Sequence, residues 1–120
     1  MKKLIIAGSR SFNDYDKLKS EVMNFIVEID EIPIIISGTA KGADKLGERF
    51  AEEYELEVDL YPANWNEYGK RAGPIRNEEM AKNATHCIVF WDGKSSGSKS
   101  MIDLAKKYQL NLKVIMYETN

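Results

Sequence analysis

Cysteine and histidine are almost absent from this sequence: its 120 residues include one of each. A single cysteine excludes an internal disulfide framework and a thiolate zinc cluster, and a single histidine excludes a multi-histidine metal site within one chain. The two residues, His86 and Cys87, are adjacent in a predicted strand, where neighbouring side chains point to opposite faces. This spacing favours two packed side chains over a catalytic dyad. We therefore expect no metal site, no bound cofactor and no nucleophile–base pair.

The sequence also lacks an excess of charge of one sign and any long apolar run. Its 17 lysine and arginine residues and 19 acidic residues leave a net charge of −2. This balance gives no overall attraction to nucleic acid or to an anionic membrane, although it is compatible with a local basic patch. No apolar stretch approaches the roughly 20 residues of a membrane span, and the run that starts at Leu4 ends at Gly8, too early for a signal peptide. We expect a cytoplasmic protein with no membrane partner.

What is present is the composition of an ordinary globular domain, with 43% hydrophobic and 30% charged residues. The length is close to that of a typical domain and leaves no room for a second core. The sequence therefore predicts a single domain over residues 1–120.

Short apolar runs alternate with segments whose apolar residues recur at helical spacing. The runs predict strands at residues 4–7, 32–36, 56–60, 85–91 and 112–117. The periodic segments predict a helix capped by Asp14, a second from Ala43 to Tyr54, a third that opens at Pro74 and a fourth from Met101 to Tyr108. The stretches 63–73 and 92–100 are expected to be loops.

Alternating strands and helices predict an α/β fold, a single Rossmann-like doubly wound parallel sheet of five strands. The predicted strand order is 3-2-1-4-5, and the flavodoxin-like order 2-1-3-4-5 is the alternative. In the first order, a ligand crevice opens at the carboxyl ends of the first and fourth strands.

Three loops that follow predicted strands and precede predicted helices are rich in small residues: 8–11, 37–44 and 92–99. Glycine lets a ligand approach the backbone closely, and the N–H groups at a helix N-terminus attract anions. Tight turns also use glycine and serine to cap helices, but three such loops at one sheet edge favour phosphate or nucleotide binding. None of them contains the P-loop pattern G-x-x-x-x-G-K-[ST], and the first lacks the dinucleotide pattern G-x-G-x-x-G.

The segment 64–77 is polar yet carries two aromatic residues, Trp65 and Tyr68. They can stack on a base or ribose while Arg71 and Arg76 contact phosphate. The alternative is a surface loop whose aromatic rings fold onto the third strand. Arg76 is the more suggestive cation, because Gly73 and Pro74 place it in the first turn of the predicted helix. The predicted ligand-binding residues are Gly8, Ser9, Arg10, Gly38, Thr39, Lys41, Gly42, Ala43, Asp44, Trp65, Arg76, Asn77, Asp92, Gly93, Ser96, Gly97 and Ser98.

Four motifs taken together resemble the YspA/YpsA-related branch of the SLOG superfamily. They occupy residues 8–10, 37–44, 73–77 and 92–98, and the block YPANWNEYGKRAGPIRN at 61–77 is the most specific part. The resemblance implies a Rossmann-like domain that binds a nucleotide or a nucleotide-derived molecule as a sensor, carrier or sponge. Its relatives include cytokinin-activating phosphoribohydrolases, the DNA-processing protein A family and sensor domains of antiviral systems. It also implies a phage or prophage origin and a homo-oligomer.

The phosphoribohydrolases carry the motif P-G-G-x-G-T-x-x-E, with an arginine on the preceding helix. Aligning the last glycine with Gly97 puts Met101 at the position of the glutamate, and Arg76 takes the arginine position. A thioether cannot transfer a proton, so the resemblance favours binding over glycosidic cleavage.

Two alternative functions remain. One is an N-glycosidase that uses Arg76 with Asp44 or Asp92 as the acid. The other is single-stranded nucleic-acid binding, which the net charge disfavours. The second would use Arg10, Lys41, Arg71, Arg76 and Lys99.

Overall fold

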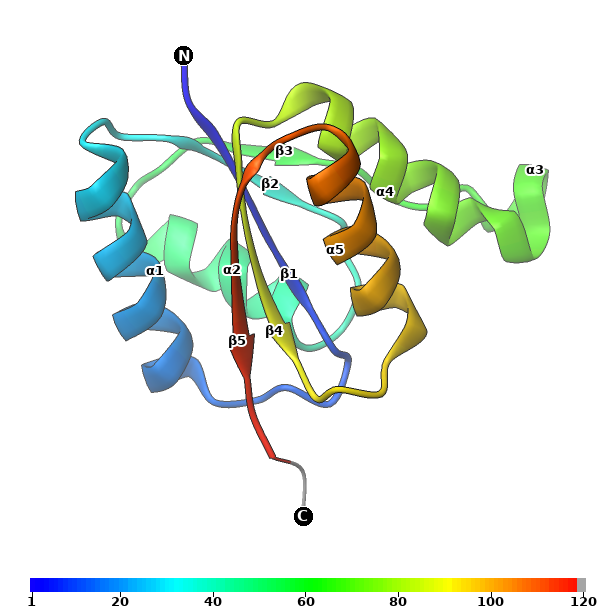
Figure 1. Cartoon of the computed structure of the whole chain (residues 1–120), viewed down its shortest axis with the longest axis horizontal. Helices are drawn as coiled ribbons and strands as arrows, with labels where there is room; N and C mark the ends of the chain where they lie inside the picture. Colours follow the sequence, from blue (N-terminus) through cyan, green and yellow to red (C-terminus); the bar gives the residue numbers. More distant parts are fainter. Residues whose placement is uncertain (119–120) are drawn as a thin grey trace.

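The computed structural model describes residues 1–118, in which five strands alternate with helices (Figure 1). The predicted domain extends to residue 120, so its last two residues lie outside the described part. The strands are β1 (Lys3–Gly8), β2 (Ile34–Ser37), β3 (Val58–Leu60), β4 (His86–Trp91) and β5 (Asn111–Met116). The helices are α1 (Tyr15–Ile29), α2 (Ala43–Glu53), α3 (Trp65–Tyr68), the 3-10 turn η1 (Gly69–Arg71), α4 (Ala72–Asn83) and α5 (Ser96–Lys107).

The strands form one parallel sheet in the order β3-β2-β1-β4-β5. This confirms the predicted Rossmann-like order, and the flavodoxin-like alternative is wrong. The central strand β1 pairs with β2 on one side and β4 on the other, for example Leu4 with Ile35 and with His86. Since all strands run the same way, the loops that leave β1, β2 and β4 emerge at one edge of the sheet.

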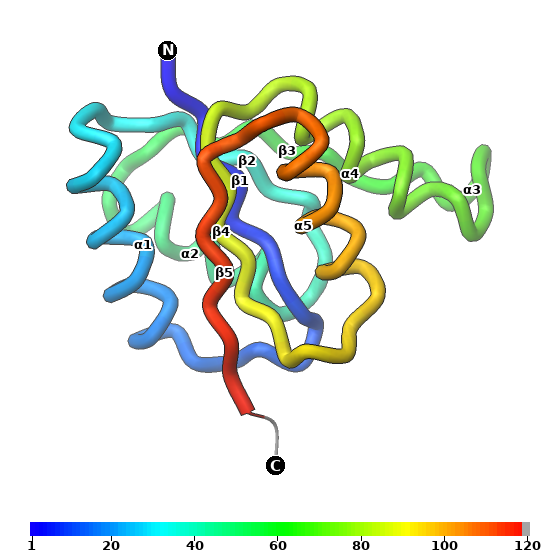
Figure 2. The backbone as a smooth tube through the Cα atoms, in the orientation of Figure 1, coloured from blue at the N-terminus to red at the C-terminus, as the bar shows by residue number. Residues whose placement is uncertain are grey.

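Helices cover both faces of this sheet, α1 and α2 on one and α4 and α5 on the other (Figures 1 and 2). Residues of β1 alternate between the two cores: Leu4 and Ile6 pack toward α1 and α2, whereas Ile5 and Ala7 pack toward α4 and α5. A strand covered on both faces must be apolar at every position, which explains the run at the start of the sequence. Among residues 1–118, no helix combines the length and the hydrophobicity needed to cross a bilayer.

Two stretches predicted to be loops are partly helical. Between residues 63 and 73, Asn64 caps α3 by accepting the N–H of Glu67 at 3.1 Å. The chain then continues through η1 into α4, which begins at Ala72 rather than at Pro74. Proline is tolerated there because the first N–H groups of a helix have no partner within it. As a result, Arg76 lies in the second turn of α4, not in the first.

The last helix also begins earlier than predicted, at Ser96 instead of Met101. Ser95 is its N-cap, because its side chain accepts the N–H of Ser98. Serine is a strong N-cap, and the apolar periodicity that begins at Met101 reports only the buried face of the helix. The earlier start places Ser96, Gly97 and Ser98 in the first turn of α5.

Candidate functional site

A cleft of about 740 Å³ opens at the carboxyl edge of the sheet, where the loops after β1 and β4 lie beside α4 and the first turn of α5. Eleven of the predicted residues line it: Gly8, Ser9, Arg10, Asp44, Trp65, Arg76, Asn77, Asp92, Ser96, Gly97 and Ser98. The other lining residues were not predicted from the sequence: they are Ala7, Ser11, Ala40, Lys70, Gly73, Pro74, Met80, Ser95, Ser100 and Met101. Helical spacing was the signal for two of these, since Met80 and Met101 follow Arg76 and Gly97 by four positions.

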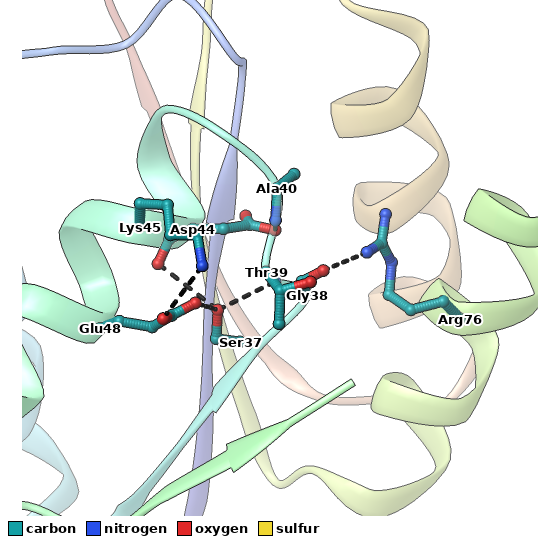
Figure 3. A network of polar contacts seen from close by, with 8 residues as sticks. All are labelled: Ser37, Gly38, Thr39, Ala40, Asp44, Lys45, Glu48 and Arg76. Atoms are coloured by element: carbon teal, nitrogen blue, oxygen red, sulfur yellow. Dashed lines mark hydrogen bonds and ion pairs between the residues drawn. The ribbon is translucent and has the colours of Figure 1, made fainter. Parts of the chain in front are cut away.

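Arg76 extends from α4 to Gly38, the residue that follows β2 (Figure 3). Its Nη1 donates to the carbonyl oxygen of Gly38, and its Nε donates to Oδ1 of Asn77 at 2.8 Å. Burial lowers the pKa of the guanidinium, and the nearby Asp44 carboxylate opposes this effect. Arginine remains charged under any ordinary condition, so the cleft contains a fixed cation held at two points.

Gly38 is outside the cleft lining, and its role is to leave room for charged side chains. A Cβ at this position would lie 2.8 Å from Oδ2 of Asp44 and 3.0 Å from Nη1 of Arg76. Any larger residue would therefore displace one of the two groups. The glycine at this turn allows the Arg76 guanidinium to reach the backbone.

Asp44 is a carboxylic acid in the cleft wall, in the first turn of α2, and it is only 5% exposed. Its Oδ2 accepts the N–H of Ala40 at 3.1 Å. Burial raises its pKa to about 6, with Glu48 adding to the rise, while the Ala40 hydrogen bond, Arg76 and Arg10 act in the opposite direction. Asp44 therefore ionises around pH 6, where an ordinary aspartate is already fully ionised.

Hydroxyl groups form the opposite wall, at the N-terminus of α5. The Oγ of Ser98 lies 3.4 Å from that of Ser9 and 3.2 Å from that of Ser95. Asp92 holds this turn together, because its Oδ1 accepts the N–H groups of Ser95 and Lys94 at 2.8 and 2.9 Å. These backbone hydrogen bonds lower the pKa of Asp92, so this carboxylate stabilises the turn.

The 39–42 loop owes its glycine to packing. Gly42 has a φ of +79°, and a Cβ there would lie 2.6 Å from the carbonyl oxygen of Arg10 and would also collide with that of Ser9. Ser37 anchors the same loop, since its Oγ donates to Glu48 at 2.6 Å and accepts the N–H of Thr39 at 3.1 Å (Figure 3). Within this loop only Ala40 lines the cleft, and Gly42 packs against neighbouring backbone. The predicted site residues that lie outside the cleft lining are Gly38, Thr39, Lys41, Gly42, Ala43 and Gly93.

Trp65 lies at the rim of the cleft with 52% of its surface exposed. A Cβ on Gly73 would lie 3.6 Å from its ring, so the indole rests on the start of α4. Figure 1 shows α3 at the far end of α4, projecting from the body of the protein. Arg71 and Tyr68 are exposed and do not line the cleft.

His86 and Cys87 are packed side chains on opposite faces of the sheet, as predicted. The His86 ring lies 5.6 Å from that of Phe25, and burial lowers its pKa. Cys87 belongs to the core beneath α4 and α5, where burial raises the pKa of its thiol. Within residues 1–118, no group of three or more potential metal ligands comes together.

Two sequence comparisons relate this chain to known proteins. The family model described as "YspA, cpYpsA-related SLOG family" matches residues 2–68. The Gene 61 protein of Mycobacterium phage D29 is 31% identical over 117 residues, which cover 89% of this chain and 90% of the phage protein. This relative supports the expected relation to phage proteins.

A solved structure shows the same fold. The X-ray structure of DNA processing protein A from Streptococcus pneumoniae superimposes with a TM-score of 0.68 at 20% identity and covers 94% of this chain. The chain spans about half of that longer protein, 49% of its length. At this identity, the likeness concerns the fold alone.

Proposed function

The chain belongs to the YspA- and cpYpsA-related SLOG family, and from this premise we propose that it binds a nucleotide or a nucleotide-derived small molecule in the cleft. Family membership supports a nucleotide-related binding or processing role. The observation that carries the proposal is the convergence in one cleft of a fixed cation, Arg76, with the first turn of α5. Both are suited to a phosphate group.

The anionic part of the ligand lies between Arg76, Arg10 and the hydroxyl wall. The N-terminus of α5 carries the positive end of the helix dipole. The Ser96 and Gly97 N–H groups belong to its first turn, whereas the Ser98 N–H already donates to the Ser95 cap. Arginine suits phosphate better than lysine does, because its planar fork donates two parallel hydrogen bonds. This end of the cleft therefore selects for negative charge.

The remaining part of the ligand lies against the apolar side of the cleft. Met80 and Met101 are almost fully buried and line its floor, and Trp65 stands at the rim. A thioether is polarisable and packs well against a flat ring, and an indole offers a stacking surface. A base joined to a phosphate through a ribose has both the apolar and the anionic part that the cleft requires.

The proposal is tested by releasing small molecules from the purified protein by denaturation and identifying them by mass spectrometry. Titration calorimetry with AMP, GMP, CMP and UMP then measures affinity directly. We expect at least one nucleoside monophosphate or a released nucleotide derivative to bind with a dissociation constant in the micromolar range. A protein that releases nothing and binds none of the four at millimolar concentration would contradict the proposal.

A second candidate function, N-glycosidic cleavage, rests on Asp44. A carboxyl group whose pKa is about 6 can donate a proton near neutral pH, and Asp44 lies in the wall of the cleft beside Arg76. Against this stands Met101, which lines the cleft at 2% exposure where the phosphoribohydrolase glutamate is expected. Asp103 does not replace it, because it points outward into an ion pair with Lys99 at 2.9 Å.

We therefore expect little or no release of free base and ribose 5-phosphate when the protein is incubated with nucleoside monophosphates. General acid–base assistance typically contributes roughly 100- to 10,000-fold to a rate, so its loss leaves only residual turnover. Chromatographic detection of free base is the measurement. Robust release that disappears in Asp44→Asn would instead establish the enzyme, and Asp92→Asn is the companion variant for the second acid.

Nucleic-acid binding has less support. Of the five cations it would use, Arg10 and Arg76 line the cleft, whereas Lys41, Arg71 and Lys99 do not. Lys99 is also paired with Asp103. A strip of phosphates requires cations along a continuous surface.

A further inference from the structure

We propose that Asn77 is a positioning residue that fixes the Arg76 guanidinium and joins it to the first turn of α5. The inference rests on the proposed function, because it concerns how the anion-binding groups of the same cleft are held. Asn77 itself is 7% exposed and lies one position after Arg76 on α4.

Both the oxygen and the nitrogen of the Asn77 side-chain amide form hydrogen bonds. Its Oδ1 accepts Nε–H of Arg76 at 2.8 Å, and its Nδ2 donates to the carbonyl oxygen of Gly97 at 3.4 Å. Adjacent residues on a helix are rotated by about 100° and do not normally face each other. The contact therefore requires the long arginine side chain to fold over its neighbour, which fixes the plane of the guanidinium.

A second contact holds the other side of the same group. Nη1 of Arg76 donates to the carbonyl oxygen of Gly38 at the end of β2. Asn77 and Gly38 thus engage two nitrogens of the guanidinium, and its other N–H groups are the ones that a ligand can use. Through Asn77, the cation from α4 and the turn of α5 become parts of one hydrogen-bonded unit.

Asparagine suits this position because the two contacts have opposite polarity. Arg76 needs an acceptor, and the Gly97 carbonyl needs a donor. An aspartate accepts from Arg76 but presents a second oxygen to the carbonyl, and it brings negative charge to an anion site. An alanine offers neither contact.

The first test needs no ligand. In NMR spectra of the wild-type protein, we expect a resolved Nε–H resonance of Arg76 that exchanges slowly with water. Asn77→Ala should speed this exchange roughly tenfold or more, since the hydrogen bond is lost. Asn77→Asp should keep the resonance protected, because an aspartate still accepts the Arg76 Nε–H. This variant replaces Asn77→Ala in the test if the alanine variant folds poorly.

Asn83→Ala is the matched control, because Asn83 is exposed on the same helix and, within residues 1–118, its side chain donates only to the carbonyl oxygen of Glu79. It should leave the Arg76 resonance unchanged. An Arg76 resonance that is equally protected in Asn77→Ala would overturn the inference, whether or not the protein binds nucleotides.

The second test is a double-mutant cycle with AMP as the probe. Asn77→Ala should weaken AMP binding by roughly 3- to 10-fold when Arg76 is present and should have no effect in the Arg76→Ala background. The same loss in both backgrounds would mean that Asn77 acts independently of Arg76 and would contradict the positioning role. If wild-type protein does not bind AMP, the cycle uses whichever of GMP, CMP and UMP does bind. Binding of none of the four counts against the proposed function, and the exchange measurement still decides the role of Asn77.

Discussion

Replacing Arg76 with alanine is expected to weaken the binding of a nucleoside monophosphate by roughly 10- to 100-fold. A hydrogen bond to a charged group contributes about 1.5–3 kcal/mol, and about 1.4 kcal/mol corresponds to a factor of ten in affinity. Arg76 is a cation on the cleft wall that two neutral acceptors hold in place. Titration calorimetry of the wild-type protein and the variant measures the change.

Lys82→Ala is the control for this experiment. Lys82 is an exposed cation on the same helix and does not line the cleft, so its removal changes the net charge equally without touching the site. Affinity should stay within a factor of two of the wild type. If Arg76→Ala lowers the melting temperature as severely as it lowers affinity, Arg76 has a structural role and not a binding role. If Lys82→Ala lowers affinity just as much as Arg76→Ala, the loss reflects net charge and not a contact in the cleft.

Replacing Asp44 with asparagine is expected to stabilise the protein above pH 6 and to leave it almost unchanged at pH 4. The pKa of Asp44 is raised from 3.8 to about 6 in the folded state, so between these values the folded protein holds a proton that the unfolded chain has released. Stability therefore falls as the pH rises through this window, and the loss is complete above pH 6. Two pKa units correspond to about 3 kcal/mol, which is the upper limit of the expected gain at pH 7.5.

Urea denaturation of both proteins at several pH values between 4 and 8 measures this difference. Asp103→Asn is the matched control, since it makes the same substitution at a carboxylate whose side chain is 56% exposed and lies outside the cleft lining. A difference between wild type and Asp44→Asn that is the same at every pH would contradict the raised pKa. A buried carboxylate that weakens the fold at neutral pH is typical of a residue kept for its chemistry.

The sheet was predictable because burial on both faces leaves a direct trace in the sequence. Leu4 to Ala7 are apolar at every position because β1 is central. In β3 apolar and acidic residues alternate, because this strand lies at the edge of the sheet. The helical character of residues 65–71 was not predictable from apolar spacing, because this segment buries none of its side chains. Its start is set by one local hydrogen bond, the Asn64 cap.

The sequence predicted which loops form the candidate site, but it did not predict which side chains contact one another there. Glycine after a buried strand indicated the correct edge of the sheet, but it did not separate Gly42, which packs against carbonyl oxygens, from Gly97, which lines the cleft. The reach of Arg76 to the Gly38 carbonyl joins residues 38 positions apart. Such a contact depends on how α4 packs against the sheet beside the end of β2, and the spacing of apolar residues carries no information about it.

Gly97 has a consequence for selectivity. A Cβ at this position would meet nothing within 4 Å, so the fold itself would accept a methyl group there. Only a molecule bound in the cleft could make a methyl group at residue 97 unfavourable. In the proposed binding mode, the size of residue 97 therefore sets how closely the ligand can approach the backbone of α5. Relatives with alanine or serine at the corresponding position would keep the fold and hold their ligand farther from the helix, and the same scaffold would then discriminate among ligands by one side chain.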